Sequence, residues 1–220
     1  MCGRFAFYSP AEAAAALFEF EAGFTTEPRY NIAPTQLIPV VRSARPHGRE
    51  LVMLRWGLVP FWAKDPSIGN RMINARAETL ADKPAYRHAY QNRRCLVLAD
   101  GFYEWRKEAG GKSPYFISLA SGEPFAFAGL WEAWTDRASG ESLQTAAIVT
   151  TAANAFVGEL HDRMPVVLQP DTASDWLAGK PGVLDAVGTK PLEFQAWPVD
   201  RKVNEPRNEG PELIRRVARV

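Results

Sequence analysis

The chain has 220 residues, 46% of them hydrophobic and 23% charged, a composition typical of a globular protein with a core of good size. No apolar run approaches the roughly 20 residues of a membrane span, and the amino terminus lacks the basic and apolar regions of a signal peptide. Two cysteines, Cys2 and Cys95, do not suggest a disulfide framework. We therefore expect one domain over residues 1–220, in the cytoplasm and away from membranes.

The formal net charge of +1 is unevenly distributed along the chain. Residues 1–107 contain 15 Lys and Arg against 10 Asp and Glu, a net charge of +5, whereas residues 108–220 contain 11 against 15, a net charge of −4. Twelve of the early basic residues are arginine, which favours planar phosphate contacts and stacking on aromatic rings. The excess is compatible with a nucleic-acid partner, although a solvated surface would explain half of it.

The elements follow from apolar periodicity and from turn residues. Ser9-Pro10-Ala11-Glu12 is a helix-capping pattern with Ser9 as the cap. In chain order, the patterns predict a helix that opens at this cap and runs through 13–20, strands at 37–42 and 51–56, and a helix at 84–92. A series of strands follows at 95–99, 101–106, 115–119, 125–134 and 146–151. The last predicted elements are a helix at 152–159, a strand at 166–168, a helix at 171–178, a strand at 195–199 and a docked tail or frayed helix at 210–217. This series predicts an α+β fold with a mainly antiparallel β core, barrel-like or strongly curved, and peripheral helices.

Residues 57–63, Gly-Leu-Val-Pro-Phe-Trp-Ala, have no clean period and contain a proline that interrupts either element. They form a predicted loop with large aromatic side chains. Trp56, Phe61 and Trp62 either cover the core or offer flat faces to a ligand. Cys95 lies in an apolar strand and is expected in the core.

Cys2 follows the initiator methionine. Because its side chain is small, we expect Met1 to be removed, which leaves an α-amine and a thiol on adjacent carbons. The thiolate is a strong nucleophile, and an α-amine with a pKa of about 7.7–8.0 is partly unprotonated at neutral pH. Together they can attack one aldehyde carbon twice and close a five-membered ring. The alternative is that Cys2 is only a small apolar side chain.

Four other polar residues stand where a strand or loop would otherwise be apolar. Asn74 and Arg76 are two residues apart, so both face one side of an extended segment. Glu104 is flanked in the sequence by aromatic residues, which favours a raised pKa and a general acid or base, although a solvent-facing edge position is the alternative. His161 lies between a predicted helix and strand and suits proton transfer near pH 7. His47 and His88 have no such context and are interpreted as surface residues.

No metal or cofactor is expected, because two separated cysteines and three scattered histidines lack the spacing of structural zinc. The chain also lacks a glycine-rich phosphate loop and the Gly-x-Ser-x-Gly pattern of serine hydrolases.

Several stretches in order resemble the SOS-response-associated peptidase (SRAP) family across the whole chain. They are Met-Cys-Gly-Arg at 1–4, Tyr-Asn-Ile-Ala-Pro-Thr-Gln at 30–36, Trp-Gly-Leu-Val-Pro-Phe-Trp at 56–62, Ile-Asn-Ala-Arg-Ala-Glu-Thr at 73–79, Ala-Asp-Gly-Phe-Tyr-Glu-Trp at 99–105, His-Asp-Arg-Met-Pro at 161–165 and Asn-Glu-Gly-Pro-Glu-Leu-Ile at 208–214.

The resemblance implies a nucleoid-associated protein that shields abasic sites in single-stranded DNA through a covalent crosslink. It implies that Cys2 is the nucleophile and that Asn74, Glu104 and His161 occupy active-site positions. It also implies a lyase-like side reaction and thiol autopeptidase removal of Met1. A monomer is expected, and contact with the replication machinery cannot be read from the sequence. The implied DNA-contacting residues are Arg4, Asn31, Pro39, Phe61, Trp62 and Arg76, with one tryptophan at 61–63 where some members have two in succession.

Two alternatives remain open. In an N-terminal-nucleophile hydrolase, Cys2 attacks an amide with its own α-amine as base and Asn74 helps form an oxyanion hole. In a non-covalent binder of single-stranded DNA, Cys2 has no chemical role.

Overall fold

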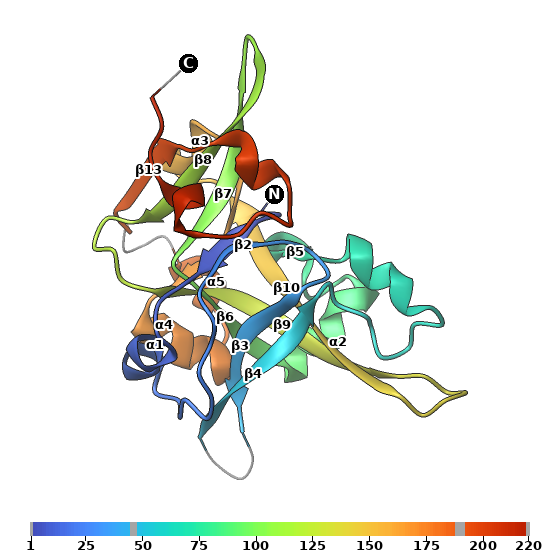
Figure 1. Cartoon of the computed structure of the whole chain (residues 1–220). Helices are drawn as coiled ribbons and strands as arrows, with labels where there is room; N and C mark the ends of the chain where they lie inside the picture. The colour runs from blue at the N-terminus through green and yellow to red at the C-terminus, as the bar shows by residue number, and fades with distance from the viewer. Residues whose placement is uncertain (1, 45–47, 188–191, 219–220) are drawn as a thin grey trace.

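The computed structural model describes residues 2–44, 48–187 and 192–218 (Figure 1). Its centre is a closed barrel of five strands, in which β10 pairs with β4, β4 with β3, β3 with β6, β6 with β9, and β9 again with β10. The pairings are antiparallel except for β4 and β10. These strands are β3 (Leu37–Ser43), β4 (Arg49–Trp56), β6 (Arg94–Ala99), β9 (Phe125–Thr135) and β10 (Ser142–Ala152).

A second, antiparallel sheet has the strand order β13-β8-β7-β1-β2 and occupies the upper half of the view in Figure 1. Its strands are β1 (Phe5–Phe7), β2 (Arg29–Ile32), β7 (Gly101–Glu108), β8 (Gly111–Leu119) and β13 (Phe194–Pro198). Because only Asp100 separates β6 from β7, the barrel continues directly into this sheet. The predicted α+β class with a mainly antiparallel core is confirmed.

Short strands and helices surround the two sheets. The strands are β5 (Asn74–Arg76), β11 (Arg163–Pro165) and β12 (Val167–Leu168). The α-helices are α1 (Ala11–Phe18), α2 (Pro84–Asn92), α3 (Ala155–Gly158), α4 (Pro170–Leu177) and α5 (Val183–Ala186). The 3-10 helices are η1 (Pro66–Arg71), η2 (Ala77–Thr79), η3 (Arg201–Asn204) and η4 (Pro211–Ile214). Among the described residues, no helix is long and apolar enough to cross a membrane.

Aromatic side chains connect the barrel to β1. The Phe5 ring packs edge-on against Trp56 and Phe127, with centroid distances of 5.2 and 5.8 Å. All three side chains are fully buried, so Trp56 belongs to the core rather than to an exposed platform. Cys95 is also fully buried, as predicted, and its carbonyl accepts a hydrogen bond from the Trp176 indole. This packing fixes the strand that carries the amino terminus.

The boundaries of the first helix differ from the sequence prediction. Helix α1 begins at Ala11, and the Ser9 hydroxyl donates to Asp100 Oδ1 at 2.6 Å instead of capping the helix. Asp100 also accepts the backbone N–H groups of Tyr8 and Ser9. The helix ends at Phe18 because Glu19 adopts a left-handed conformation with φ of 52°. A buried tertiary acceptor therefore replaced the local capping interaction.

The predicted helix at 152–159 was too long. Strand β10 extends to Ala152, which pairs with Arg163 of β11, and the helix begins only at Ala155 after an Asn154 cap. The pairing with β11 is non-local, so the local sequence pattern could not reveal it. The predicted tail segment is docked: the Trp197 indole donates to the Ile214 carbonyl at 2.7 Å.

Candidate functional site

Cys2 is positioned by the register of β1 against β7. Phe5 pairs with Phe102, and the N–H of Tyr103 donates to the Arg4 carbonyl at 3.0 Å. Continuing this antiparallel register toward the amino terminus brings Cys2 alongside the part of β7 that contains Glu104. Cys2 is fully buried there.

Asn74 binds the backbone of Cys2. Its Nδ2 donates to the Cys2 carbonyl at 2.7 Å, while its Oδ1 is buried without a hydrogen-bond partner among the described residues. Strand β5 holds Asn74 by pairing it with Ile148 of β10, and the Tyr86 hydroxyl of α2 donates to the Asn74 carbonyl at 2.9 Å. The amide therefore has a fixed donor and an unused acceptor at the site.

Glu104 is 2% exposed, which excludes the solvent-facing alternative. Its neighbours Tyr103 and Trp105 alternate to the other face of β7, as side chains do along a strand. The aromatic residues on its own face are Phe102, two residues earlier on β7, and Tyr115, its cross-strand partner on β8. The prediction that Glu104 is enclosed was correct, but the rings adjacent in the sequence do not provide the enclosure.

Burial raises the pKa of Glu104, and the nearby His161 partly opposes that shift. Burial also raises the pKa of the Cys2 thiol, and the charge of Glu104 raises it further. Both groups therefore favour their protonated forms in this enclosed state. The effect of the Glu104 charge on the thiol pKa indicates that the thiol and the carboxyl belong to one site.

His161 lies between α3 and β11, as predicted. The backbone N–H of Arg163 donates to His161 Nδ1 at 3.0 Å, so the neutral imidazole carries its proton on Nε2. Asp162 Oδ1 lies 2.9 Å from the same Nδ1 and can pair with it once the ring is protonated. The His161 side chain is 30% exposed, so solvent reaches the imidazole whose charge acts on Glu104.

The six sequence-predicted DNA contacts do not form one cluster. Arg4 is 9% exposed, and its Nη1 donates to Asn31 Oδ1 at 2.7 Å and to the Val203 carbonyl at 2.6 Å. Asn31 in turn donates to the carbonyls of Glu205 and Asn208. In this structure, Arg4 and Asn31 therefore connect the amino-terminal strand to the carboxyl-terminal segment.

The other four predicted contacts lie elsewhere. Phe61 and Trp62 are 50% and 45% exposed on the loop after β4, and Arg76 is exposed at the end of β5. Pro39 is buried in β3 opposite Met53. Of these residues, Phe61, Trp62 and Arg76 present side chains that a ligand can reach.

Sequence reasoning missed Tyr86 and the environment of His88. His88 was interpreted as a surface residue without context, but its Nδ1 lies 2.9 Å from Glu132 Oε2, and its ring lies 4.8 Å from that of Phe61. Glu132 comes from β9, so no local pattern connects it with α2. His47 lies outside the described residues.

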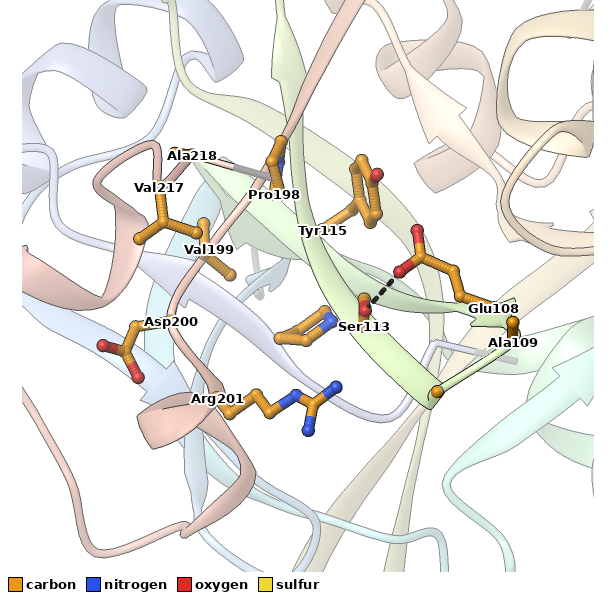
Figure 2. A pocket seen from close by; sticks show the side chains of 12 residues that line it. Glu108, Ala109, Ser113, Tyr115, Pro198, Val199, Asp200, Arg201, Val217 and Ala218 are labelled. Carbon is orange, nitrogen blue, oxygen red and sulfur yellow. Dashed lines mark hydrogen bonds between the residues drawn. The ribbon is translucent and has the colours of Figure 1, made fainter. Parts of the chain in front are cut away.

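A separate groove of about 750 Å³ lies between the β7–β8 hairpin and the carboxyl-terminal segment (Figure 2). Its lining includes Tyr115, Pro198 and Arg201, and Ser113 donates to Glu108 at its edge. None of Cys2, Asn74, Glu104 and His161 lines it. The groove shares Tyr115 with the surroundings of Glu104 but contains none of the four candidate-site residues.

Residues 1–206 match the family model described as SOS response associated peptidase (SRAP). The chain belongs to the SRAP family. It is 41% identical over 223 residues to a Bacillus subtilis protein named abasic site processing protein YoaM, with 97% of each chain covered. It is 35% identical over 229 residues to abasic site processing protein YedK of Escherichia coli, covering 99% of this chain and all of that one.

Solved structures share the SRAP fold seen here. A protein from Bacteroides thetaiotaomicron superposes with a TM-score of 0.86 at 24% identity, covering 99% of this chain and 100% of that one. A phage-related protein from Bordetella bronchiseptica gives a TM-score of 0.72 at 32% identity, covering 91% and 95% of the two chains. The family resemblance indicated by the sequence motifs is thus confirmed.

Proposed function

We propose that this SRAP protein captures abasic sites in single-stranded DNA as a covalent thiazolidine adduct on Cys2, after removal of Met1. The observation that carries the proposal is the hydrogen bond from Asn74 to the Cys2 backbone, at a site where the buried Glu104 acts on the Cys2 thiol. The names of the relatives, abasic site processing proteins, supply the substrate class.

The reaction consumes one aldehyde and releases one water. The Cys2 α-amine adds to C1′ of the open-chain deoxyribose, and loss of water gives an imine. The Cys2 sulfur then adds to the same carbon, its proton moves to the nitrogen, and the five-membered ring closes. No oxidant or cofactor is needed, because C1′ exchanges its two bonds to oxygen for one bond to nitrogen and one to sulfur and keeps its oxidation state.

The burial that raises the pKa of the thiol favours one order of these steps. A buried, protonated thiol is a weak nucleophile, so the amine attacks first and the thiol reacts second. Glu104 is suited to donate a proton to the departing hydroxyl and then to accept the proton of the thiol, since a carboxyl with a raised pKa does both near neutral pH. One side chain thereby serves as acid and then as base.

His161 and Asn74 support the same sequence of steps. His161 is partly exposed and exchanges protons between solvent and Glu104. Asn74 keeps the Cys2 backbone in place through Nδ2. Its Oδ1, which has no partner in the described part of the chain, accepts a hydrogen bond from the α-amine or from the sugar. Such pre-arranged hydrogen bonds reduce the loss of freedom on reaching the transition state.

DNA binding in this proposal depends on the backbone and on stacking. Trp62 and Phe61 offer faces for bases, each stack contributing roughly 1–3 kcal/mol, and Arg76 offers a phosphate contact. A DNA contact by Arg4, Asn31 or Pro39 stays a prediction of the family resemblance, because all three side chains are buried in this structure. Lyase-like strand cleavage follows if the imine eliminates before the ring closes, and removal of Met1 is the minimal autopeptidase reaction.

Intact-mass spectrometry after incubation with an abasic oligonucleotide tests the proposal. We expect loss of Met1 and a mass gain equal to the oligonucleotide minus one water. Cys2→Ser keeps the α-amine and should give only an adduct that borohydride traps, while Cys95→Ser should react like the wild type. A heat-stable adduct in Cys2→Ser would refute the thiazolidine.

Turnover of an amide substrate without DNA adduct formation would support the hydrolase alternative, and binding without any adduct would support the non-covalent binder.

A further inference from the structure

A groove of about 720 Å³ lies where the ends of β3, α2 and α4 meet. It contains none of the four residues of the candidate site. The side chains that give it its chemistry are Arg42, Glu50, His88, Arg93, Arg94 and Trp131. The lining thus contains three guanidinium groups, one carboxylate, one imidazole and one indole ring.

The arginines are held in place by aromatic rings. Arg42 and Arg93 lie over the Trp131 ring at 4.2 and 4.9 Å from its centroid. Arg94 lies over the rings of Tyr90 and Trp176 at 4.3 and 4.6 Å. Stacking fixes each guanidinium plane before a ligand arrives, so less side-chain entropy is lost on binding.

Two of the stacked arginines retain donors for a ligand. Arg42 uses Nε for Glu50 and Nη1 for Gln144, and Arg94 uses Nε and Nη1 for backbone carbonyls. Within the described parts of the chain, neither Nη2 has a hydrogen-bond partner. A guanidinium has five N–H donors in a planar fork that fits phosphate oxygens.

A buried carboxylate connects this groove with the aromatic loop. Glu132 is 1% exposed; its Oε1 lies 2.5 Å from Arg93 Nη1 and its Oε2 lies 2.9 Å from His88 Nδ1. His88 in turn contacts the half-exposed Phe61, next to Trp62. A continuous series of contacts therefore runs from the exposed aromatic loop to the arginines of the groove.

The groove also explains part of the charge asymmetry in the sequence. All three of its arginines come from residues 1–107, the half of the chain with net charge +5. Of the two acids, Glu132 is enclosed and faces Arg93 and His88, and Glu50 pairs with Arg42. The surface offered to a ligand is consequently cationic and aromatic, the combination that binds single-stranded nucleic acid.

We infer that this groove binds the phosphodiester backbone of a single strand at a distance from the abasic nucleotide, as the continuation of a track that begins at Phe61 and Trp62. The inference rests on the proposed function for its ligand class, but the groove binds intact strands whether or not Cys2 reacts. The groove increases the affinity for DNA, and the dependence of that affinity on salt, only for strands long enough to reach it.

Gln91 allows a test that leaves the stacked arginines in place, because it is exposed at the end of α2 on the groove edge. Gln91→Glu adds a negative charge to the groove and Gln91→Lys adds a positive one. Ser121→Glu, in the exposed turn between β8 and β9, is the matched charge control. Fluorescence anisotropy measures binding of oligothymidylates of about twenty and about four nucleotides over a salt series, with thymidine monophosphate as a third ligand.

We expect Gln91→Glu to weaken binding of the long strand about tenfold at low salt and Gln91→Lys to strengthen it. The salt slope should flatten by about 0.7 for each phosphate that the groove no longer neutralises, with the short strand and Ser121→Glu unaffected. Equal affinities for the long strand in both Gln91 variants would overturn the inference. An effect on thymidine monophosphate but not on the long strand would reassign the groove to free nucleotides. If the wild type forms no abasic adduct but the Gln91 variants still differ, the proposed function fails and the groove assignment stands.

Discussion

Arg4→Met should destabilise the fold rather than only weaken DNA binding. Arg4 Nη1 donates to Asn31 Oδ1 and to the Val203 carbonyl, and Asn31 and Val203 are fully buried. A hydrogen bond to a charged group contributes roughly 1.5–3 kcal/mol, so two of them correspond to about 3–6 kcal/mol. Burial lowers the pKa of Arg4, which reduces the net value of the interaction, but truncation leaves both acceptors buried and unpaired.

For a chain of this size, each kcal/mol shifts Tm by roughly 2–4 °C, so we expect Arg4→Met to lower Tm by at least about 6 °C. Differential scanning calorimetry and urea unfolding measure the effect. Arg137→Met, in the exposed turn between β9 and β10, is the matched control and should change Tm by less than about 2 °C. An unchanged Tm for Arg4→Met together with weaker DNA binding would refute this reasoning and make Arg4 chiefly a DNA contact.

Two further predictions concern the candidate site. Asn74→Ala leaves the Cys2 carbonyl without its hydrogen-bond donor, at a cost of about 1–3 kcal/mol. We therefore expect single-turnover adduct formation, followed on denaturing gels, to slow roughly tenfold to hundredfold. The control is Asn70→Ala, which replaces an exposed asparagine of η1 and should leave the rate unchanged. Burial raises the pKa of Glu104 in the folded chain above its unfolded value of about 4.3. Between these two pKa values the folded chain binds more protons than the unfolded chain, so the free energy of unfolding falls as the pH rises through the folded pKa. Glu104→Gln should therefore slow adduct formation. The Tm gain of this variant over the wild type should be larger at pH 8 than at pH 4. An equal Tm difference at both pH values would contradict the raised pKa.

Proline positions and apolar patterns in the sequence correctly located the helices and strands whose ends depend only on neighbouring residues. Pro84 at the start of α2 and the apolar runs of β3 and β6 predicted these elements within a residue, because proline and hydrophobic periodicity act over one or two turns. Local sequence patterns predicted the wrong boundary where a residue or strand distant in the sequence replaces the local interaction. Ser9 donates to Asp100 instead of capping α1, and β10 continues to Ala152 because β11 pairs with it.

The residue types of the site were also evident from the sequence. An amino-terminal thiol, an amide, a carboxyl and an imidazole stand out because each interrupts an apolar or irregular segment. The order of the motifs was specific enough to indicate the SRAP family, which the family model confirms. The enclosure of Glu104 was predictable from the sequence. The position of Tyr115 on the same face was not, because the register between β7 and β8 depends on both strands and cannot be inferred from either one alone.

Only the tertiary structure decided how the polar groups are used. Closure of the barrel and the pairing of β1 with β7 bring Cys2, Asn74 and Glu104 together from positions up to about a hundred residues apart. The same packing assigns Arg4 to the carboxyl-terminal segment and gives His88 a buried carboxylate partner in Glu132. Sequence determines which charges and nucleophiles a chain carries, whereas burial and partner geometry set their protonation and accessibility, and both arise only when distant segments pack.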